Sequence, residues 1–264
     1  MSDAADHLLE FDEYADAIAD AAVVLRDNAA RSGLDAAVPT CPGWTVQDLL
    51  VHQGSVHRWA TAALHGERLD VDTAQREGAG ATDLLEWLGD GVDDLLRTLD
   101  RTPEDHPAWF FLADAPPARL AWARRQCHET TIHAVDAMTT SLGHPPTARQ
   151  VWFGARLAAD GIDELLTGFL PRESTRFRPG PRERVLSVVP HEGERAWSVR
   201  FTPGAVTSRR CGRHDVPSAD TTLVGSAVDL YLALWNRAGH GQDVEERGEP
   251  ILAAWSTEQK VTWR

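Results

Sequence analysis

The spacing of apolar residues changes once along this chain, near Pro171, and this change limits the possible folds more than any other feature. Before it, apolar residues recur every three or four positions, which is the period of amphipathic helices. After it come short runs rich in β-branched and aromatic residues, which are typical of strands. The sequence therefore predicts an α+β protein with a helical domain over 1–170 and a small C-terminal α+β domain over 171–264.

Breaks at glycine and proline divide the first part into helices. Thr45-Val46-Gln47-Asp48 resembles a capping box, with Asp in the place of the more usual Glu, and it indicates a helix start. Pro116 and Pro117 suit the opening turn of a later helix. We expect helices near 8–31, 45–65, 81–100, 117–141 and 147–170.

The second part contains two β-rich runs separated by His191-Glu192-Gly193-Glu194, a natural hairpin connection. A third strand and two helices should follow them. The expected strands are 184–189, 196–201 and 221–224, and the expected helices are 226–237 and 251–255.

One segment of the helical part carries groups suited to metal binding. Glu129 and His133 are four residues apart on an expected helix, so their side chains point the same way, one turn apart. His52, in another expected helix, supplies a third ligand, and two imidazoles with one carboxylate suit zinc and leave a coordination position open. Without a metal, Glu129 and His133 would be a helical surface pair and His52 a hydrogen-bonded core histidine.

Rotation about the helix axis separates these histidines from their neighbours. His128 and His133 differ by five residues, or roughly 140°, so this is not the zincin motif, in which both histidines share a face. His52 falls among apolar residues at steps of three or four, whereas His57 lies off that line. His57 and His128 either support a ligand residue or are exposed, and we expect them to be exposed.

Composition narrows the classes of function. A formal net charge of −14 disfavours nucleic acid or an anionic membrane as partner. Three cysteines without clustered spacing indicate a reducing compartment, and Cys41 is interpreted as a small packed thiol. No apolar run has the length of a membrane span or a signal peptide, so we expect a cytoplasmic protein.

Two segments resemble the signatures of the mycothiol-dependent maleylpyruvate isomerase family. Residues 38–49 (VPTCPGWTVQDL), followed by His52 and His57-Arg58-Trp59, resemble its first signature, and His128-Glu129-Thr130 with His133 and Asp136-Ala137 resemble its second. The resemblance implies a DinB-like four-helix bundle that holds a divalent metal, usually zinc, followed by a small C-terminal α/β domain. It places the metal ligands on His52, Glu129 and His133.

The resemblance also implies a low-molecular-weight thiol, typically mycothiol, as cosubstrate. An open zinc position lowers the pKa of a bound thiol, and the thiolate is the competent nucleophile. It would either isomerise a small electrophile such as maleylpyruvate or remain attached to it, as in an S-transferase. Arg237 roughly matches a family arginine that serves the reaction and could clamp a carboxylate. Alternatively, it is a solvated arginine at a helix C-terminus.

Asp136 is open to two interpretations, as a group that orients a ligand histidine or as an ordinary hydrogen-bonding residue. A different class of function also remains, in which the chain is a non-catalytic metal-binding helical bundle that acts as a regulator or binding protein. The sequence does not indicate the physiological electrophile or the oligomeric state.

Overall fold

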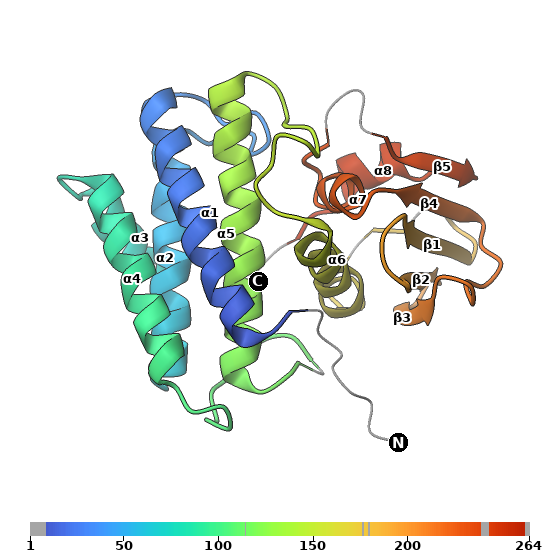
Figure 1. Ribbon diagram of the computed structural model, residues 1–264, viewed down its shortest axis with the longest axis horizontal. Helices are drawn as coiled ribbons and strands as arrows, with labels where there is room; N and C mark the ends of the chain where they lie inside the picture. The colour runs from blue at the N-terminus through green and yellow to red at the C-terminus, as the bar shows by residue number, and fades with distance from the viewer. Residues whose placement is uncertain (1–8, 114, 176, 179, 239–242, 262–264) are drawn as a thin grey trace. The chain divides into compact units, whose positions relative to one another are not determined.

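The computed structural model describes residues 9–113, 115–175, 177–178, 180–238 and 243–261 (Figure 1). Two compact units make up the chain. One is formed by Glu10–Pro146, and the other by Thr147–Arg264 together with the segment that precedes Glu10. Residue 8, where the first helix was expected to begin, lies outside the described residues.

Four long helices form the first unit, which confirms the predicted helical bundle. α1 packs against α5 and α4, and α2 packs against the same two helices, so the four close around a common core. A short helix that was not predicted, α3, lies against α2 and α4. The helices are α1 (Phe11–Ser32), α2 (Val46–Leu64), α3 (Val71–Ala79), α4 (Leu84–Arg101) and α5 (Ala118–Leu142).

Local signals in the sequence explain where α2 and α5 begin and end. The Thr45 side chain accepts a hydrogen bond from the Asp48 backbone, and the Asp48 carboxylate accepts one from the Thr45 backbone, so the predicted capping box is present. Gly143 ends α5 in the left-handed conformation, with φ of 77°. These limits place His52 in the second turn of α2 and Glu129 and His133 near the middle of α5.

Trp87 on α4 joins three helices of the bundle. Its ring lies so close to Gly54 of α2 and Gly78 of α3 that a Cβ atom on either glycine would overlap it, at 2.2 Å and 2.7 Å respectively. The Arg58 guanidinium covers the ring at 3.8 Å from its centroid. Glycine at these two positions therefore permits the close packing of α2, α3 and α4.

The second unit is a five-stranded sheet with helices, consistent with the predicted α+β class. The strand order is β3-β2-β1-β4-β5, with β1 and β4 parallel and the other neighbours antiparallel. Its helical elements are α6 (Ala155–Asp163), a π-helical turn (Glu164–Phe169), α7 (Ala227–Leu234) and α8 (Leu252–Glu258), and its strands are β1 (Arg184–Pro190), β2 (Arg195–Phe201), β3 (Val206–Gly212), β4 (Thr221–Gly225) and β5 (Glu245–Gly248).

An ion pair is buried inside this second unit. The Asp163 carboxylate, which is fully buried, accepts two hydrogen bonds from Arg210, at 2.6 and 2.8 Å, and one from the indole nitrogen of Trp197, at 2.7 Å. These three donors compensate for the loss of water around the carboxylate. The contacts fasten the end of α6 to β2 and β3.

Three expectations about the second half differ from the structure. The division falls at Thr147 rather than after Leu170, because α6 packs on α7. The helix expected over 147–170 begins only at Ala155. The helix expected to reach Arg237 ends at Leu234, and Asn236 beyond it has a positive φ of 61° that no helix continues.

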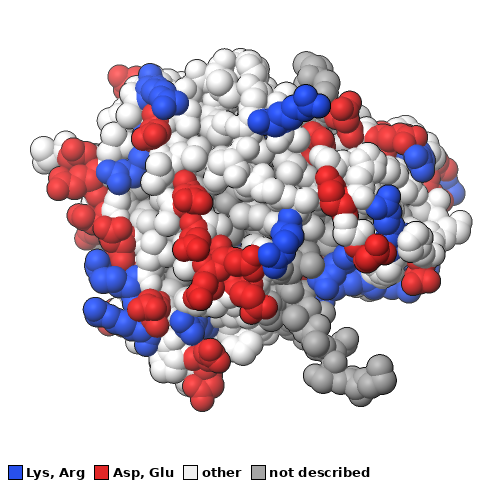
Figure 2. All heavy atoms as spheres, viewed as in Figure 1, with Lys and Arg blue, Asp and Glu red and all other residues white. Residues whose placement is uncertain are grey.

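Charged side chains of both signs are mixed on the face of the molecule that Figure 2 shows. Acidic side chains gather over α1, where Asp12, Asp16 and Asp20 recur every four residues on the exposed side of the helix. Within the described residues, no helix combines the length and apolar character that a membrane span requires.

Candidate metal centre

Helices α2 and α5 bring the three predicted ligands together inside the bundle. His52 Nε2 lies 3.1 Å from Glu129 Oε1, and His133 Nε2 lies 3.4 Å from the same oxygen. One donor atom from each residue lies within 4.8 Å of the other two. The three side chains chosen from helical geometry therefore converge, although 77 residues separate His52 from Glu129.

The donor set fits a divalent metal such as zinc. With bond lengths of about 2.0–2.1 Å, ligand atoms of a tetrahedral zinc site stand roughly 3.3 Å apart, close to the 3.1 and 3.4 Å separations seen here. Two imidazole nitrogens and one carboxylate oxygen would leave a fourth position for another molecule.

Arg125, which was not predicted to belong to the site, fixes the Glu129 carboxylate. Its Nη2 donates to Glu129 Oε2 at 3.0 Å, while Oε1 faces the two histidines. The carboxylate therefore offers one oxygen to the cluster. The signal was present in the sequence, because Arg125 precedes Glu129 by four residues on the same helix.

Asp136 contacts Nδ1 of His133, the ring nitrogen that does not face Glu129. Its Oδ2 lies 2.9 Å from His133 Nδ1, so His133 presents Nε2 to Glu129. The Cys41 thiol donates to the same Asp136 oxygen at 3.3 Å. Cys41, His133 and Asp136 also lie close enough to form a second possible ligand group, but these hydrogen bonds already account for their proximity. The arrangement supports the orienting interpretation of Asp136.

Trp44 forms an aromatic wall beside the cluster. Its ring stacks on His133, with centroids 6.0 Å apart, and lies tilted against His52 at 4.9 Å. No role for Trp44 in the site was predicted from the sequence. Its place in the segment that precedes α2 was visible in the sequence, but its contact with α5 arises only from the tertiary fold.

The electrostatics of the cluster keep the carboxylate ionised. Burial raises the pKa of Glu129, but hydrogen bonds with His133 and His52 and the charge of Arg125 outweigh it and hold that pKa well below its usual value. Burial lowers the pKa of His133, but hydrogen bonds with Asp136, Cys41 and Glu129 outweigh burial and raise it well above normal. For His52, burial prevails and lowers the pKa. A metal bound here would therefore displace a proton from His133.

The two neighbouring histidines point elsewhere, as the rotation argument predicted. His57 is fully buried, and its Nε2 lies 2.9 Å from the Thr130 hydroxyl and 2.7 Å from Gln53 Nε2. His128 is also fully buried, with its ring edge-on to Tyr14 of α1. Both residues belong to the core of the bundle, so the expectation that they are exposed is wrong.

Arg237 belongs to the second unit. It lies just beyond α7, half-buried, and its guanidinium donates to the backbone carbonyl of Trp235 at 2.7 Å. Its part in a reaction stays a prediction.

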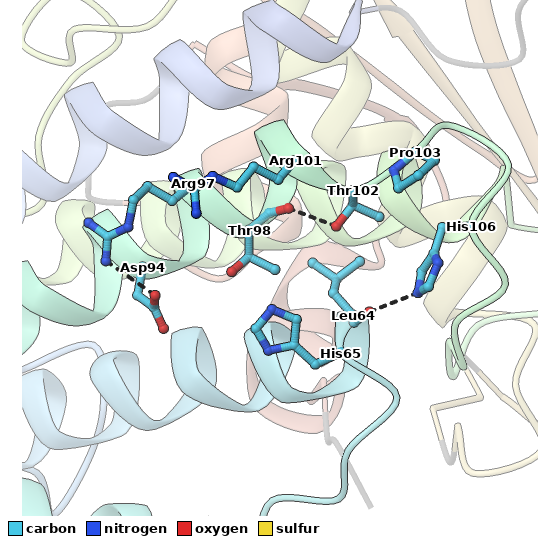
Figure 3. Close-up of a pocket in the computed structure, with 9 residues that line it drawn as sticks. All are labelled: Leu64, His65, Asp94, Arg97, Thr98, Arg101, Thr102, Pro103 and His106. Atoms are coloured by element: carbon cyan, nitrogen blue, oxygen red, sulfur yellow. Dashed lines mark hydrogen bonds and ion pairs between the residues drawn. The ribbon is translucent and has the colours of Figure 1, made fainter.

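A separate pocket of about 430 Å³ opens where α2 and α4 end (Figure 3). His65 and Thr98 point into the space between the two helices. Leu64, in its lining, follows His52 by twelve residues, or roughly 18 Å along α2. The pocket is therefore distinct from the cluster of His52, Glu129 and His133.

Comparison with known proteins gives a consistent result over both units. The family described as "Mycothiol maleylpyruvate isomerase N-terminal domain" matches residues 11–138, and the "MDMPI C-terminal domain" matches residues 156–254. No curated protein matches the chain.

Two solved structures share the fold. A crystal structure of the mycothiol-dependent maleylpyruvate isomerase has 15% sequence identity and a TM-score of 0.62, and the match covers 97% of this chain and 99% of that one. A mutant of that isomerase, with a histidine replaced by alanine, matches over the same shares with 15% identity and a TM-score of 0.60.

Fold and site together define a protein in which a helical bundle with a His–Glu–His cluster is joined to a small α/β domain. Because the two family domains match most of its length, the chain belongs to the mycothiol maleylpyruvate isomerase family.

Proposed function

We propose that this protein is a zinc-dependent enzyme that uses a low-molecular-weight thiol, mycothiol by family, as the nucleophile toward a small electrophile. The reaction is isomerisation of the electrophile or S-transfer to it. The observation that carries the proposal is the convergence of His52 Nε2, Glu129 Oε1 and His133 Nε2 at the spacing of a tetrahedral metal site. Family membership supports the thiol.

Each residue near the cluster has a role that follows from its contacts. His52, Glu129 and His133 would hold the zinc. Bound zinc would lower the pKa of a thiol that coordinates it. Asp136 holds the Nδ1 side of His133, and Arg125 holds the second oxygen of Glu129. The Trp44 ring packs against both imidazole rings.

We further propose that Arg237 binds a carboxylate of the electrophile, as the family resemblance implies. Replacing it with glutamine should then reduce turnover of acidic electrophiles and leave bound zinc unchanged. Equal turnover by Arg237→Gln and the parent protein would contradict this role.

A test compares zinc content and thiol consumption in the parent protein and in His52→Ala. The parent should hold one zinc per chain and consume thiol with at least one electrophile from a panel, whereas His52→Ala should lose both properties. His65→Ala is the matched control, because His65 is exposed and follows α2 on the same stretch of chain. Full zinc occupancy in His52→Ala would contradict the ligand assignment.

The same measurements separate the enzyme from a metal-binding regulator. A parent protein that holds zinc through His52 but consumes no thiol with any electrophile would favour the regulator.

A further inference from the structure

The proposed metal ligands form one end of a series of side chains on two facing helices. On α5, Trp122, Gln126, Glu129 and His133 follow at steps of four, three and four residues, which keeps them within roughly 60° of one another. On α2, His52 is followed by Val56 and Trp59 at the same kind of step. Because α2 packs against α5, these two rows lie along the same interface.

The other end of the series is aromatic. The rings of Trp59 and Trp122 meet edge to face, with centroids 4.9 Å apart. Trp109 and Phe111 lie against both, and Trp109 is 60% exposed. The series of side chains that begins at the proposed ligands therefore ends at this group of aromatic rings, which is partly exposed to solvent at Trp109.

Between these two ends lies a polar group without a partner. Gln126 is fully buried, and within the described part of the chain neither its Oε1 nor its Nε2 makes a hydrogen bond. Thr130, one turn further along α5, by contrast contacts both Gln53 and His57. A buried amide left unpaired costs about 1–3 kcal/mol, so its presence requires an explanation.

We propose that the Gln126 amide is a positioning residue for the thiol cosubstrate, an inference that rests on the function proposed above. Gln126 lies three residues before Glu129, about 4.5 Å along the helix axis. A thiol whose sulfur occupies the open metal position would place a group three or four bonds from that sulfur beside Gln126. The amide N–H and C=O of a cysteinyl thiol stand at this separation, and they match the free acceptor and donor of Gln126. The ligand class is therefore a cysteinyl thiol whose amide Gln126 recognises.

The test uses Gln126→Met, which keeps the length of the side chain and removes the amide. Binding of N-acetylcysteinamide and of propane-1-thiol to the zinc-loaded, full-length protein is measured by calorimetry. The parent protein should prefer the amide-bearing thiol. Gln126→Met should weaken binding of N-acetylcysteinamide by roughly 5- to 30-fold, the value of one or two hydrogen bonds, and leave propane-1-thiol unchanged.

A second measurement distinguishes this role from a structural one. Urea unfolding without zinc or thiol should show Gln126→Met at least as stable as the parent, because the removed amide has no partner within the protein. Gln53→Met is the matched control on α2. It should be less stable, because the Gln53 amide contacts His57 and Thr130 at 2.7 and 3.1 Å. Gln126→Leu repeats the experiment if the methionine variant does not fold.

Three results would overturn the inference. A Gln126→Met protein destabilised like Gln53→Met, with the thiol preference intact, would make Gln126 a structural residue. A parent protein that binds zinc and thiols without preferring the amide would refute the inference and leave the proposed function standing. A parent protein that binds neither zinc nor thiol would refute both.

Discussion

Asp136 shows how one hydrogen bond decides which nitrogen of His133, a proposed metal ligand, faces the cluster. His133 has two ring nitrogens, and the one that faces Asp136 Oδ2 at 2.9 Å is engaged. The other therefore points to Glu129 Oε1. A neutral, metal-binding His133 would donate its Nδ1 proton to Asp136, which increases the basicity of Nε2.

Asp136→Asn should weaken zinc binding by roughly 10- to 100-fold, because it replaces the carboxylate that orients His133 with a neutral amide. Competition with a chromogenic chelator measures this affinity. Asp94→Asn is the control, since Asp94 is an exposed carboxylate on α4 that forms an ion pair with nearby Arg97. Equal affinity in Asp136→Asn and the parent protein would show that Asp136 has no effect on the ligand.

His57 provides a prediction about acid stability. Burial, and then the nearby charge of Arg58, lower its pKa to about 3 in the folded protein, whereas an unfolded histidine titrates near 6.5. Between these values the unfolded chain binds a proton that the folded chain does not, so stability falls as the pH drops below 6.5. From pH 7 to pH 5 this residue should cost about 2 kcal/mol.

Urea unfolding of metal-free protein at pH 7 and pH 5 measures that cost. His57→Gln removes the titrating ring, so its loss of stability between the two pH values should be smaller than that of the parent by about 2 kcal/mol. If both proteins lost the same free energy of unfolding, His57 would not be the source of acid sensitivity.

At the scale of elements, the helices that carry the site were predictable and several of their partners were not. Local features define α2 and α5, since the capping box at Thr45 and the glycine at position 143 are present in the sequence. β3 was missed because its sequence, VTSRRCG, has few apolar residues and it is recognisable only from its pairing with β2. The parallel pairing of β1 with β4 joins segments distant in sequence, which local spacing cannot encode.

Local spacing likewise predicts only part of the candidate site. Rotation about α5 predicted that Glu129 and His133 share a face, because this depends only on helical geometry. The contacts of Trp44 and Cys41 with α5 residues depend on how the segment before α2 folds back. The spacing of residues in the sequence does not predict this path.

Close packing at Trp87 leads to a prediction about α2. Gly54→Ala should destabilise the protein by about 1–3 kcal/mol, because the added methyl group would overlap the Trp87 ring. Gly154→Ala is the control, since a Cβ atom there meets nothing within 4 Å and the backbone is extended. Chemical denaturation compares the two variants with the parent, and equal stability of all three would contradict the packing argument.

At the scale of the whole molecule, the two units carry different parts of the proposed activity. The bundle of residues 10–146 contains the His–Glu–His cluster, and the second unit contains Arg237. Family domains match both units, so the full chain is the appropriate object for activity measurements.

The ligand assignment is tested most directly by anomalous diffraction at the zinc edge from crystals of the full-length protein grown with zinc. We predict one strong peak about 2.0–2.2 Å from His52 Nε2, Glu129 Oε1 and His133 Nε2. A peak bound instead by Cys41 and Asp136, with His52 turned away, would contradict it.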